Sequence, residues 1–396
     1  MVYNITDNIK YVGVDDRDID LFESQYDVPE GVSYNSYLIM DEKTCVFDTV
    51  DATKTEEWIA NVTQALEGRT LDYIIVQHIE PDHSGSFAAA VKAFPDAKIV
   101  GNAKTFMLLG QFFDLAELNI EDRKVEVKEG DTISLGSHTL QFVMAPMIHW
   151  PEVMMTYEKS EKVFFSADAF GKFGALDFDD PEGWACEARR YYFGIVGKYG
   201  NPVQQLLKKA SALEIEKIMP LHGPVLPMPG TELSYYLDTY NTWSSYEAET
   251  HGVFVAYASI HGNTAKAAKL IAEKLEAKGE KVAISDICRE DMAECVEDAF
   301  RYDRMVICAA SYDAGVFLPM HDFLNHLTVK TYQNRKVAIL ENGSWAPSAA
   351  RTIKAILEPL KNITVLDPVV TIKSTMKDSD IPNIDALVDA VVEAGK

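Results

Sequence analysis

The sequence is short of basic residues: it has 37 Lys and Arg against 61 Asp and Glu, a formal net charge of −24 and a pI near 4.7. Nucleic-acid affinity comes mostly from Lys and Arg that neutralise phosphates, and anionic lipid headgroups attract the same side chains. A chain this acidic is repelled by both. We therefore expect neither nucleic acid nor a membrane surface as a partner.

Long hydrophobic runs and paired cysteines are also missing. No window approaches the roughly 20 continuous apolar residues that a membrane-spanning helix needs, and the start, MVYNITDNIKYVG, lacks the basic stretch and apolar stretch of a signal peptide. The five cysteines are widely spread without a C-x-x-C pair: Cys45, Cys186, Cys288, Cys295 and Cys308. That spacing predicts reduced thiols, not a disulfide framework or a thiolate metal site. A cytoplasmic protein is expected.

What is present indicates a packed protein of two or three domains. Hydrophobic residues make up 47% and charged residues 25%, as in soluble globular proteins, and 396 residues exceed the roughly 100–200 of an ordinary domain. Before residue 250 the pattern predicts a hairpin at 33–50, further strands at 71–78, 97–102, 131–146, 162–168 and 217–223, and helices at 84–94, 103–115, 181–199, 202–213 and within 237–252. From residue 252, apolar strands alternate regularly with amphipathic helices, which predicts a doubly wound parallel sheet of five strands.

The loop after one predicted strand carries candidate metal ligands. The stretch VQHIEPDHSGS holds His78, Glu80, Asp82 and His83 within six positions. Neutral imidazoles and carboxylates suit borderline to hard divalent ions, and the lack of cysteine argues against a structural zinc site. A surface loop of this composition is also compatible with simple solvation, so the loop alone does not decide.

Three further candidates stand where other predicted strands end. His149 follows a strand in APMIHWPE, Asp168 in VFFSADAFG and His222 in MPLHGPV. Strand ends converge on one rim of a sheet sandwich, which brings such residues together. Seven candidate ligands favour two metal ions over one. His138, in LGSHTLQ, lies in a turn-and-strand context, and we interpret it as structural.

The spacing His78-x-Glu80-x-Asp82-His83 with His149, Asp168 and His222 resembles the metallo-β-lactamase-like domain of flavodiiron proteins, also called A-type flavoproteins. Hydrolases of that fold usually show H-x-H-x-D-H and bind zinc, whereas Glu80 here replaces the middle histidine and shifts the ligand set toward iron. The resemblance implies that His78, Glu80 and His149 bind one iron and that Asp82, His83 and His222 bind the other. It implies that Asp168 bridges the two irons.

In the second half, the stretch YASIHGNT joins a buried strand to an amphipathic helix through small and hydroxyl-bearing residues. Backbone N–H groups at a helix N-terminus favour an anion such as a phosphate. Neither G-x-G-x-x-G nor G-x-x-x-x-G-K-[ST] occurs, so dinucleotide and nucleoside-triphosphate sites lose support. Such a loop also serves as an ordinary turn and helix cap.

Residues 252–396 resemble a flavodoxin-like FMN domain, in which loops at the carboxyl ends of the strands bind the flavin. The resemblance implies a first loop on the phosphate and two loops that bracket the isoalloxazine, although SYDAG and ENGSWAP depart from the usual loop patterns of the family. The implied FMN residues are Ser259, Ile260, His261, Gly262, Asn263 and Thr264 in the first loop, Ser311, Tyr312, Asp313, Ala314 and Gly315 in the second, and Asn342, Gly343, Ser344 and Trp345 in the third. Trp345 is the candidate stacking ring. The alternative is a flavodoxin-like domain without its cofactor.

The resemblance spans essentially the whole chain. It implies an α+β metallo-β-lactamase-like αββα sandwich over residues 1–250, followed by an α/β flavodoxin-like doubly wound five-stranded parallel sheet over residues 251–396. The implied activity is that of a flavodiiron oxidoreductase, which passes electrons from an external donor through FMN to the diiron centre and reduces dioxygen to water, nitric oxide to nitrous oxide, or both. No catalytic residue beyond the metal ligands is implied.

The resemblance also implies partners, and two other functions remain as alternatives. The family implies a head-to-tail homodimer, or a tetramer made from two, in which the flavin of one subunit serves the iron of its partner. The donor is open between rubredoxin, a deazaflavin cofactor and a separate reductase, and we expect no rubredoxin module because the paired cysteines it needs are missing. A zinc hydrolase of metallo-β-lactamase type fused to a flavodoxin-like domain is the main alternative. A non-enzymatic electron carrier is the other.

Overall fold

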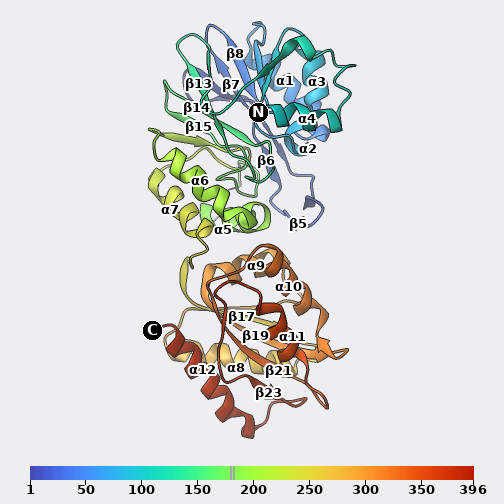
Figure 1. Cartoon of the computed structure of the whole chain (residues 1–396), viewed down its shortest axis with the longest axis vertical. Helices are drawn as coiled ribbons and strands as arrows, with labels where there is room; N and C mark the ends of the chain where they lie inside the picture. Colours follow the sequence, from blue (N-terminus) through green and yellow to red (C-terminus); the bar gives the residue numbers. More distant parts are fainter. Residues whose placement is uncertain (179–180, 182) are drawn as a thin grey trace. The chain divides into compact units, whose positions relative to one another are not determined.

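The structure is a computed structural model that describes residues 1–178, 181 and 183–396. The chain folds into two compact units (Figure 1). The first comprises Met1–Tyr192 and Asn201–Tyr240, and the second comprises Phe193–Gly200 and Asn241–Lys396. The short segment 193–200 therefore leaves the first unit, joins the second, and returns.

The first unit contains two packed sheets. The larger has the strand order β1 (Tyr3–Asn4), β2 (Ile9–Tyr11), β7 (Tyr37–Met40), β8 (Thr44–Phe47), β9 (Tyr73–Ile75), β10 (Lys98–Gly101) and β11 (Lys124–Glu126). The smaller has the order β12 (Thr132–Ser134), β13 (Thr139–Met144), β14 (Met154–Glu158), β15 (Val163–Phe165) and β16 (Lys217–Met219). The predicted hairpin is β7–β8, with Tyr37 opposite Phe47. The run 131–146 forms a second hairpin, because the polar GSH turn separates β12 from β13.

Two small antiparallel pairs of strands were not predicted from the sequence. They are β3 (Val14–Asp16) with β6 (Val32–Tyr34), and β4 (Leu21–Phe22) with β5 (Tyr26–Asp27). Each strand has only two or three residues, too few to show a period of two. Their pairing is visible only once the chain has folded.

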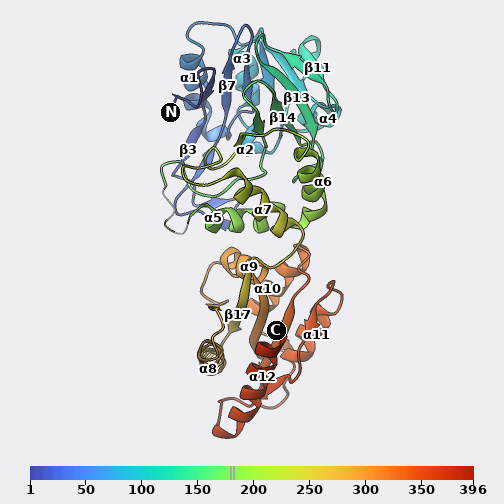
Figure 2. The same ribbon diagram turned by 90° about the vertical axis from the view of Figure 1, so that its left-hand side faces the viewer.

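Helices flank the sheets and the main core lies between them. The helices are α1 (Thr55–Ala65), α2 (Pro81–Ser84), α3 (Phe87–Ala93) and α4 (Ala103–Phe112), then α5 (Trp184–Tyr191), α6 (Gly200–Ala210) and α7 (Leu233–Ser244). Figures 1 and 2 show α1, α3 and α4 beside the first sheet and α6 beside the second. The inward residues of the facing sheets pack together, and Phe47 of β8 stacks on Phe165 of β15 with centroids 3.9 Å apart. These layers are the expected αββα sandwich.

Two expected helices are divided in the structure, and the ends of the others shift: α4 ends at Phe112 and not at 115, α6 spans Gly200–Ala210 and not 202–213, and α7 spans Leu233–Ser244 and so begins before 237. The helix expected at 84–94 is split, because Gly85 ends α2 and α3 begins at Phe87. The helix expected at 181–199 is α5 followed by a π turn (Tyr192–Val196) and a 3-10 turn (Gly197–Tyr199); its residue 182 lies outside the described residues.

The second unit is a doubly wound α/β fold. Its sheet has the order β18 (Val282–Asp286), β17 (Thr250–Ala258), β19 (Tyr302–Tyr312), β21 (Lys336–Asn342), and the four strands are parallel. The fifth position is shared by two short parallel strands, β22 (Thr364–Val365) and β23 (Val370–Ile372). A two-residue strand, β20 (Gly315–Val316), adds an antiparallel pair to β19. The order matches the flavodoxin-like arrangement.

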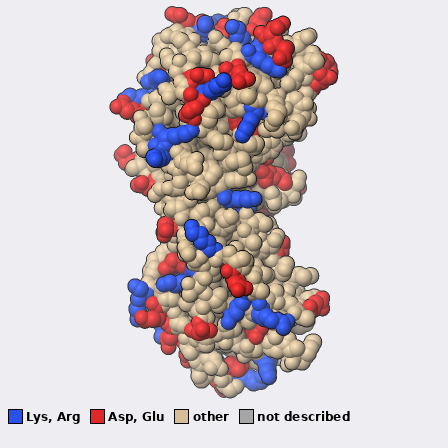
Figure 3. Space-filling view, in the orientation of Figure 1, with Lys and Arg blue, Asp and Glu red and all other residues tan. Residues whose placement is uncertain are grey.

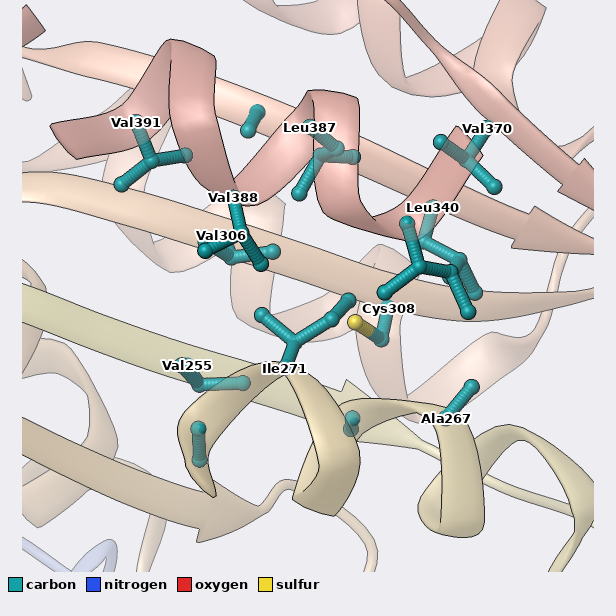
Figure 4. Close-up of a cluster of buried hydrophobic side chains, with 14 of the residues drawn as sticks. Val255, Ala267, Ile271, Val306, Cys308, Leu340, Val370, Leu387, Val388 and Val391 are labelled. Atoms are coloured by element: carbon teal, nitrogen blue, oxygen red, sulfur yellow. The ribbon is translucent and has the colours of Figure 1, made fainter. Parts of the chain in front are cut away.

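Helices cover both faces of this sheet. The helices are α8 (Asn263–Ala277), α9 (Met292–Arg301), α10 (Leu318–Val329), α11 (Ala349–Leu357) and α12 (Ile381–Ala394). Ile271 of α8 and Leu387 of α12 belong to one buried cluster with Val306 and Cys308 of β19 (Figure 4), so these two helices share one face. Phe323 of α10 packs on Phe254, which points to the opposite face.

Within the described part of the chain, no helix is long and apolar enough to span a lipid bilayer. Figure 3 shows acidic and basic side chains interspersed on the displayed face of each unit.

Candidate metal centre and cofactor cleft

Strand ends of both sheets in the first unit deliver the seven predicted ligands to one place. His78 follows β9, Asp168 follows β15 and His222 follows β16, each by three residues. His149 lies in the turn between β13 and β14. The parallel pairs β8–β9 and β15–β16 point their carboxyl ends to this rim, so the strand-end pattern has a structural cause.

Four of these residues form a first metal group: His78, Glu80, His149 and Asp168. Glu80 Oε2 lies 2.8 Å from His149 Nε2 and 3.3 Å from His78 Nε2. Asp168 Oδ2 lies 3.2 Å from each of the same two nitrogens. The four ligand atoms lie within 4.8 Å of one another.

The other three residues form a second metal group: Asp82, His83 and His222. Asp82 Oδ2 is 3.2 Å from His83 Nε2 and 3.3 Å from His222 Nε2. Adjacent Asp82 and His83 can face one ion because they lie in the single helical turn α2, which opens with Pro81 at its first position, and not in an extended loop.

Asp168 faces both groups with different oxygens. Its Oδ2 points to the first group, whereas its Oδ1 is 3.2 Å from His83 Nε2 and 3.8 Å from His222 Nε2. Asp168 is 1% exposed, and Oδ1 has no hydrogen-bond partner. A carboxylate in this position is suited to joining two metal ions.

Burial and opposite charge compete in setting the ionisation of these groups. Burial opposes protonation of the imidazoles, but neighbouring carboxylates outweigh it and raise the pKa of His83 to about 10 and that of His149 to about 9. Burial likewise opposes ionisation of Asp168, but His78 and His149 hold its pKa well below the usual range. Protons on the histidines thus balance the carboxylates, and divalent cations would replace them.

The donor set fits a pair of metal ions. Asp82 Oδ1 and His83 Nδ1 are buried without hydrogen-bond partners, and Asp82 Oδ2 and Asp168 Oδ1 face histidine nitrogens without hydrogen-bond geometry, which is costly unless a cation compensates. Nitrogen and carboxylate donors with no thiolate suit iron and similar ions.

Two supporting acids were missed by the sequence analysis. Asp48, just after β8, accepts hydrogen bonds from the backbone N–H groups of Gln77 (2.7 Å) and His78 (3.1 Å). Glu152 accepts one from His78 Nδ1 at 2.8 Å. Asp48 stands at a strand end, so the rule that found the ligands could have found it. Glu152 follows His149 by three residues and carries no such signal.

His138 lies apart from both metal groups. It is buried, and its two ring nitrogens contact Asp41 Oδ2 at 2.8 Å and Glu161 Oε1 at 3.1 Å. The contacts join the turn before β13 to the segments around Asp41 and Glu161. This placement agrees with a structural role.

The second unit contains a cleft of about 700 Å³ at the carboxyl ends of β17, β19 and β21. Thirteen of the fifteen predicted flavin residues line it: Ser259, Ile260, His261, Asn263, Thr264, Ser311, Tyr312, Asp313, Ala314, Asn342, Gly343, Ser344 and Trp345. Gly262 is the N-cap of α8 with φ +82°, and Gly315 begins β20, so these two shape the loops without lining the cleft. Trp345 is 93% exposed at the rim.

The cleft fits a phosphorylated planar ligand. Its volume is in the range of cofactor sites, and it lies at the N-terminus of α8, where no side chain caps the helix. The Ser259 hydroxyl is buried without a hydrogen-bond partner, as expected for a group reserved for a ligand. The cleft is also lined by residues that were not predicted: Ala310, Ala346, Pro347, Ser348, Arg351 and Ser374. Ser374 follows β23, so the strand-end rule could have found it.

Comparison with known proteins assigns each unit to a protein family. Residues 32–223 match the family described as ODP family beta lactamase, and residues 255–382 match the flavodoxin family. An uncharacterised protein of Methanocaldococcus jannaschii is 31% identical over 386 residues, which cover 96% of this chain and 95% of that protein. A nitric oxide reductase of Moorella thermoacetica is 28% identical over 386 residues, covering 95% and 94%.

Solved structures give the same result. A mutant of the flavo di-iron protein from Thermotoga maritima matches with a TM-score of 0.89 and 25% identity, covering 100% of this chain and 99% of that chain. The rubredoxin oxygen:oxidoreductase of Desulfovibrio gigas matches with a TM-score of 0.90 and 23% identity, covering 100% and 98%, which supports the fold alone. A metallo-β-lactamase-like unit with paired metal groups and a flavodoxin-like unit thus define this molecule. The chain belongs to the flavodiiron protein family.

Proposed function

We propose that the chain is a flavodiiron oxidoreductase that reduces dioxygen to water, nitric oxide to nitrous oxide, or both, with electrons from an external donor. One observation carries the proposal: two metal groups share Asp168 in a chain that also holds a flavin-sized cleft. The family and the nitric oxide reductase among the relatives support the reaction class.

The proposed ligands follow the two groups. His78, Glu80 and His149 would hold one iron, Asp82, His83 and His222 the other, and Asp168 both. The predicted residues of the cleft would hold FMN. When bound, the flavin and the iron pair supply the redox chemistry. We assign the metal chemistry to residues 1–250 and the flavin chemistry to residues 251–396.

The chain's own groups prepare the metal site for small substrates. Phe22, Tyr34 and Tyr191 surround His222 with their rings. The Tyr191 hydroxyl is buried without a hydrogen-bond partner, and burial together with Asp168 and Asp82 raises its pKa. It therefore stays protonated and offers an O–H donor beside the second metal group. Aromatic rings around His222 with a protonated phenol among them would suit small diatomic molecules.

We further propose a head-to-tail homodimer, or a tetramer of two such dimers, in which the flavin of one subunit serves the metal site of its partner. The proposal is supported by the placement of the two sites in separate compact units. A rubredoxin or a reductase is the proposed donor. We propose a cytoplasmic location, supported by the free and buried thiols of Cys45, Cys295 and Cys308.

Metal and flavin analysis joined to gas consumption tests the function. Purified protein should hold about two irons and one flavin per chain, and should consume dioxygen or nitric oxide when a chemically reduced mediator supplies electrons. Parallel assays with each gas would identify the preferred substrate. A colourless protein that holds zinc and consumes neither gas would contradict the proposal and favour a hydrolase.

A further inference from the structure

Glu152 is a buried acid beside the metal centre that belongs to neither metal group. Its side chain is fully buried. One oxygen, Oε1, accepts hydrogen bonds from His78 Nδ1 at 2.8 Å and from the backbone N–H of Ile79 at 3.1 Å. The other, Oε2, is also buried and has no hydrogen-bond partner. A buried carboxylate that is only half satisfied is costly to a fold, which points to a role beyond stability.

The hydrogen bond from Nδ1 to Glu152 distinguishes His78 from the other histidines of the metal centre. His222 Nδ1 donates instead to the backbone oxygen of Ser33 at 2.7 Å, and His83 Nδ1 is buried without a partner. Among the described residues, Glu152 is the one carboxylate that hydrogen-bonds the outer nitrogen of a candidate ligand. The two metal groups therefore have unequal support.

Glu152 also ties together two ligand-bearing segments. It lies in the same loop as His149, while its side chain holds His78, which follows β9. Both histidines point Nε2 at Asp168 Oδ2 from 3.2 Å. The backbone oxygen of Glu152 accepts from Asn102 Nδ2 at 2.6 Å, which anchors the loop from the other side. A change at Glu152 therefore reaches the first metal group through both histidines.

We propose that Glu152 is a positioning residue that makes the first metal group hold its ion more tightly and at a lower reduction potential than the second. A carboxylate behind a metal-bound imidazole fixes the ring, selects the tautomer with Nε2 free to bind, and makes that nitrogen a stronger donor. A stronger and more negative ligand set favours the more highly charged oxidation state of the metal. This inference rests on the proposed function.

Metal titration of matched variants tests the role of Glu152. Glu152→Gln keeps the size and loses the charge, and Glu152→Asp keeps the charge but shortens its reach. Glu158→Gln is the control, because Glu158 is a fully buried acid of β14 whose oxygens accept from the backbone N–H groups of Thr139, Ser160 and Glu161. Metal-free protein would be titrated with Co²⁺ against a chelator, with flavin content and thermal unfolding followed in parallel.

In Glu152→Gln we expect one of the two metal-binding steps to weaken by about 10–100-fold while the other is unchanged. With iron bound, the reduction potential of one iron should rise, because the variant should lose more affinity for the ferric ion than for the ferrous ion. Each tenfold difference between the two losses raises the potential by about 59 mV. Glu152→Asp should recover part of both effects. Glu158→Gln should bind both ions like the unmodified protein.

Three results would overturn the inference. Unchanged metal affinity and potential in Glu152→Gln would remove the role. Equal weakening of both binding steps, or the same loss in Glu158→Gln, would mean that Glu152 serves only the stability of the fold. If the unmodified protein binds no pair of metal ions, the proposed function itself fails. If it binds the pair and Glu152→Gln matches it, only the role of Glu152 is lost.

Discussion

At the residue scale, Asp168 is the point on which the two metal groups depend. Its two oxygens face different groups, so Asp168→Asn removes a charge that both groups share. Because loss of a mere supporting partner of a ligand costs 10–100-fold, we expect gas consumption to fall by at least about 100-fold. Oxygen and nitric oxide electrodes with a reduced mediator would measure it, with iron counted on the same sample.

Flavin content serves as the control measurement for Asp168→Asn, because the flavin cleft lies in the other unit. Flavin content should stay at the level of the unmodified protein, since none of the cleft residues lies near Asp168 in the sequence or belongs to its unit. Undiminished gas consumption by an iron-depleted but flavin-loaded variant would remove the diiron mechanism.

His138 gives a second prediction at this scale, on stability. Burial opposes a charge on His138, but hydrogen bonds to Asp41 and Glu161 outweigh it and raise its pKa. A raised folded-state pKa means that the stabilisation is complete below the unfolded value of 6.5 and is lost as pH rises through the folded value. We therefore expect His138→Gln to lower the free energy of unfolding by about 1.5–3 kcal/mol at pH 6 and by less in alkali.

Urea unfolding at a series of pH values would measure this difference. His251→Gln is a matched control, because His251 also contacts an aspartate, Asp303, at 2.9 Å but is 66% exposed. Its loss should change the free energy of unfolding by less than about 0.5 kcal/mol. A His138→Gln difference that grows with pH would contradict the assigned charge.

At the scale of elements, the sequence predicted what periodicity and strand ends encode. The strands β9, β15 and β16 were recognised from short apolar runs, and their ends located the ligands His78, Asp168 and His222. The alternation after residue 250 predicted the sheet of the second unit in the same way. The local sequence pattern is sufficient to predict an element when that element is long enough for its hydrophobic periodicity to repeat.

What the sequence did not predict depends on contacts between distant segments. Glu152 acts through a histidine 74 positions away, and no local pattern marks that pairing. The fifth strand position is divided between β22 and β23 because Pro368 stands between them and has no N–H to offer the ladder. The helical turn α2 likewise depends on packing: the Thr49 hydroxyl donates to the backbone oxygen of His83 at 2.7 Å.

The N-terminus of α8 is the expected binding site of the FMN phosphate. The Ser259 hydroxyl is buried, lines the cleft and lacks a partner, so it is available to a phosphate at the helix N-terminus. Because a hydrogen bond to a charged group contributes about 1.5–3 kcal/mol, Ser259→Ala should weaken FMN binding by about tenfold or more. The flavin-free protein should keep its stability, since only an unsatisfied hydroxyl is lost.

Quenching of flavin fluorescence on titration of the flavin-free protein would measure the affinity. Ser285→Ala is the matched control, because Ser285 is a buried serine of β18 that does not line the cleft. Equal FMN affinities of Ser259→Ala and the unmodified protein would place the phosphate elsewhere.

At the scale of the whole molecule, the division of the two sites between separate units makes the subunit pairing testable. A head-to-tail dimer matches each flavin with the metal site of the other subunit, so two differently disabled chains should complement each other. Asp168→Asn disables the metal site, and Ser259→Asp places a negative charge where the phosphate would bind. Each homodimer should be inactive although each retains the other cofactor.

Co-expression of the two chains with different affinity tags allows the mixed dimer to be purified. In it, the flavin of the Asp168→Asn subunit serves the intact metal site of the Ser259→Asp subunit, and the remaining pair is doubly disabled. One functional pair out of two predicts about half of the gas consumption of the unmodified dimer. If electrons passed instead within a single chain, every chain of the mixed dimer would lack one site and the dimer would be inactive. An inactive mixed dimer that still holds metal in its Ser259→Asp subunit and flavin in its Asp168→Asn subunit, or the failure of the two chains to associate, would therefore contradict transfer between subunits.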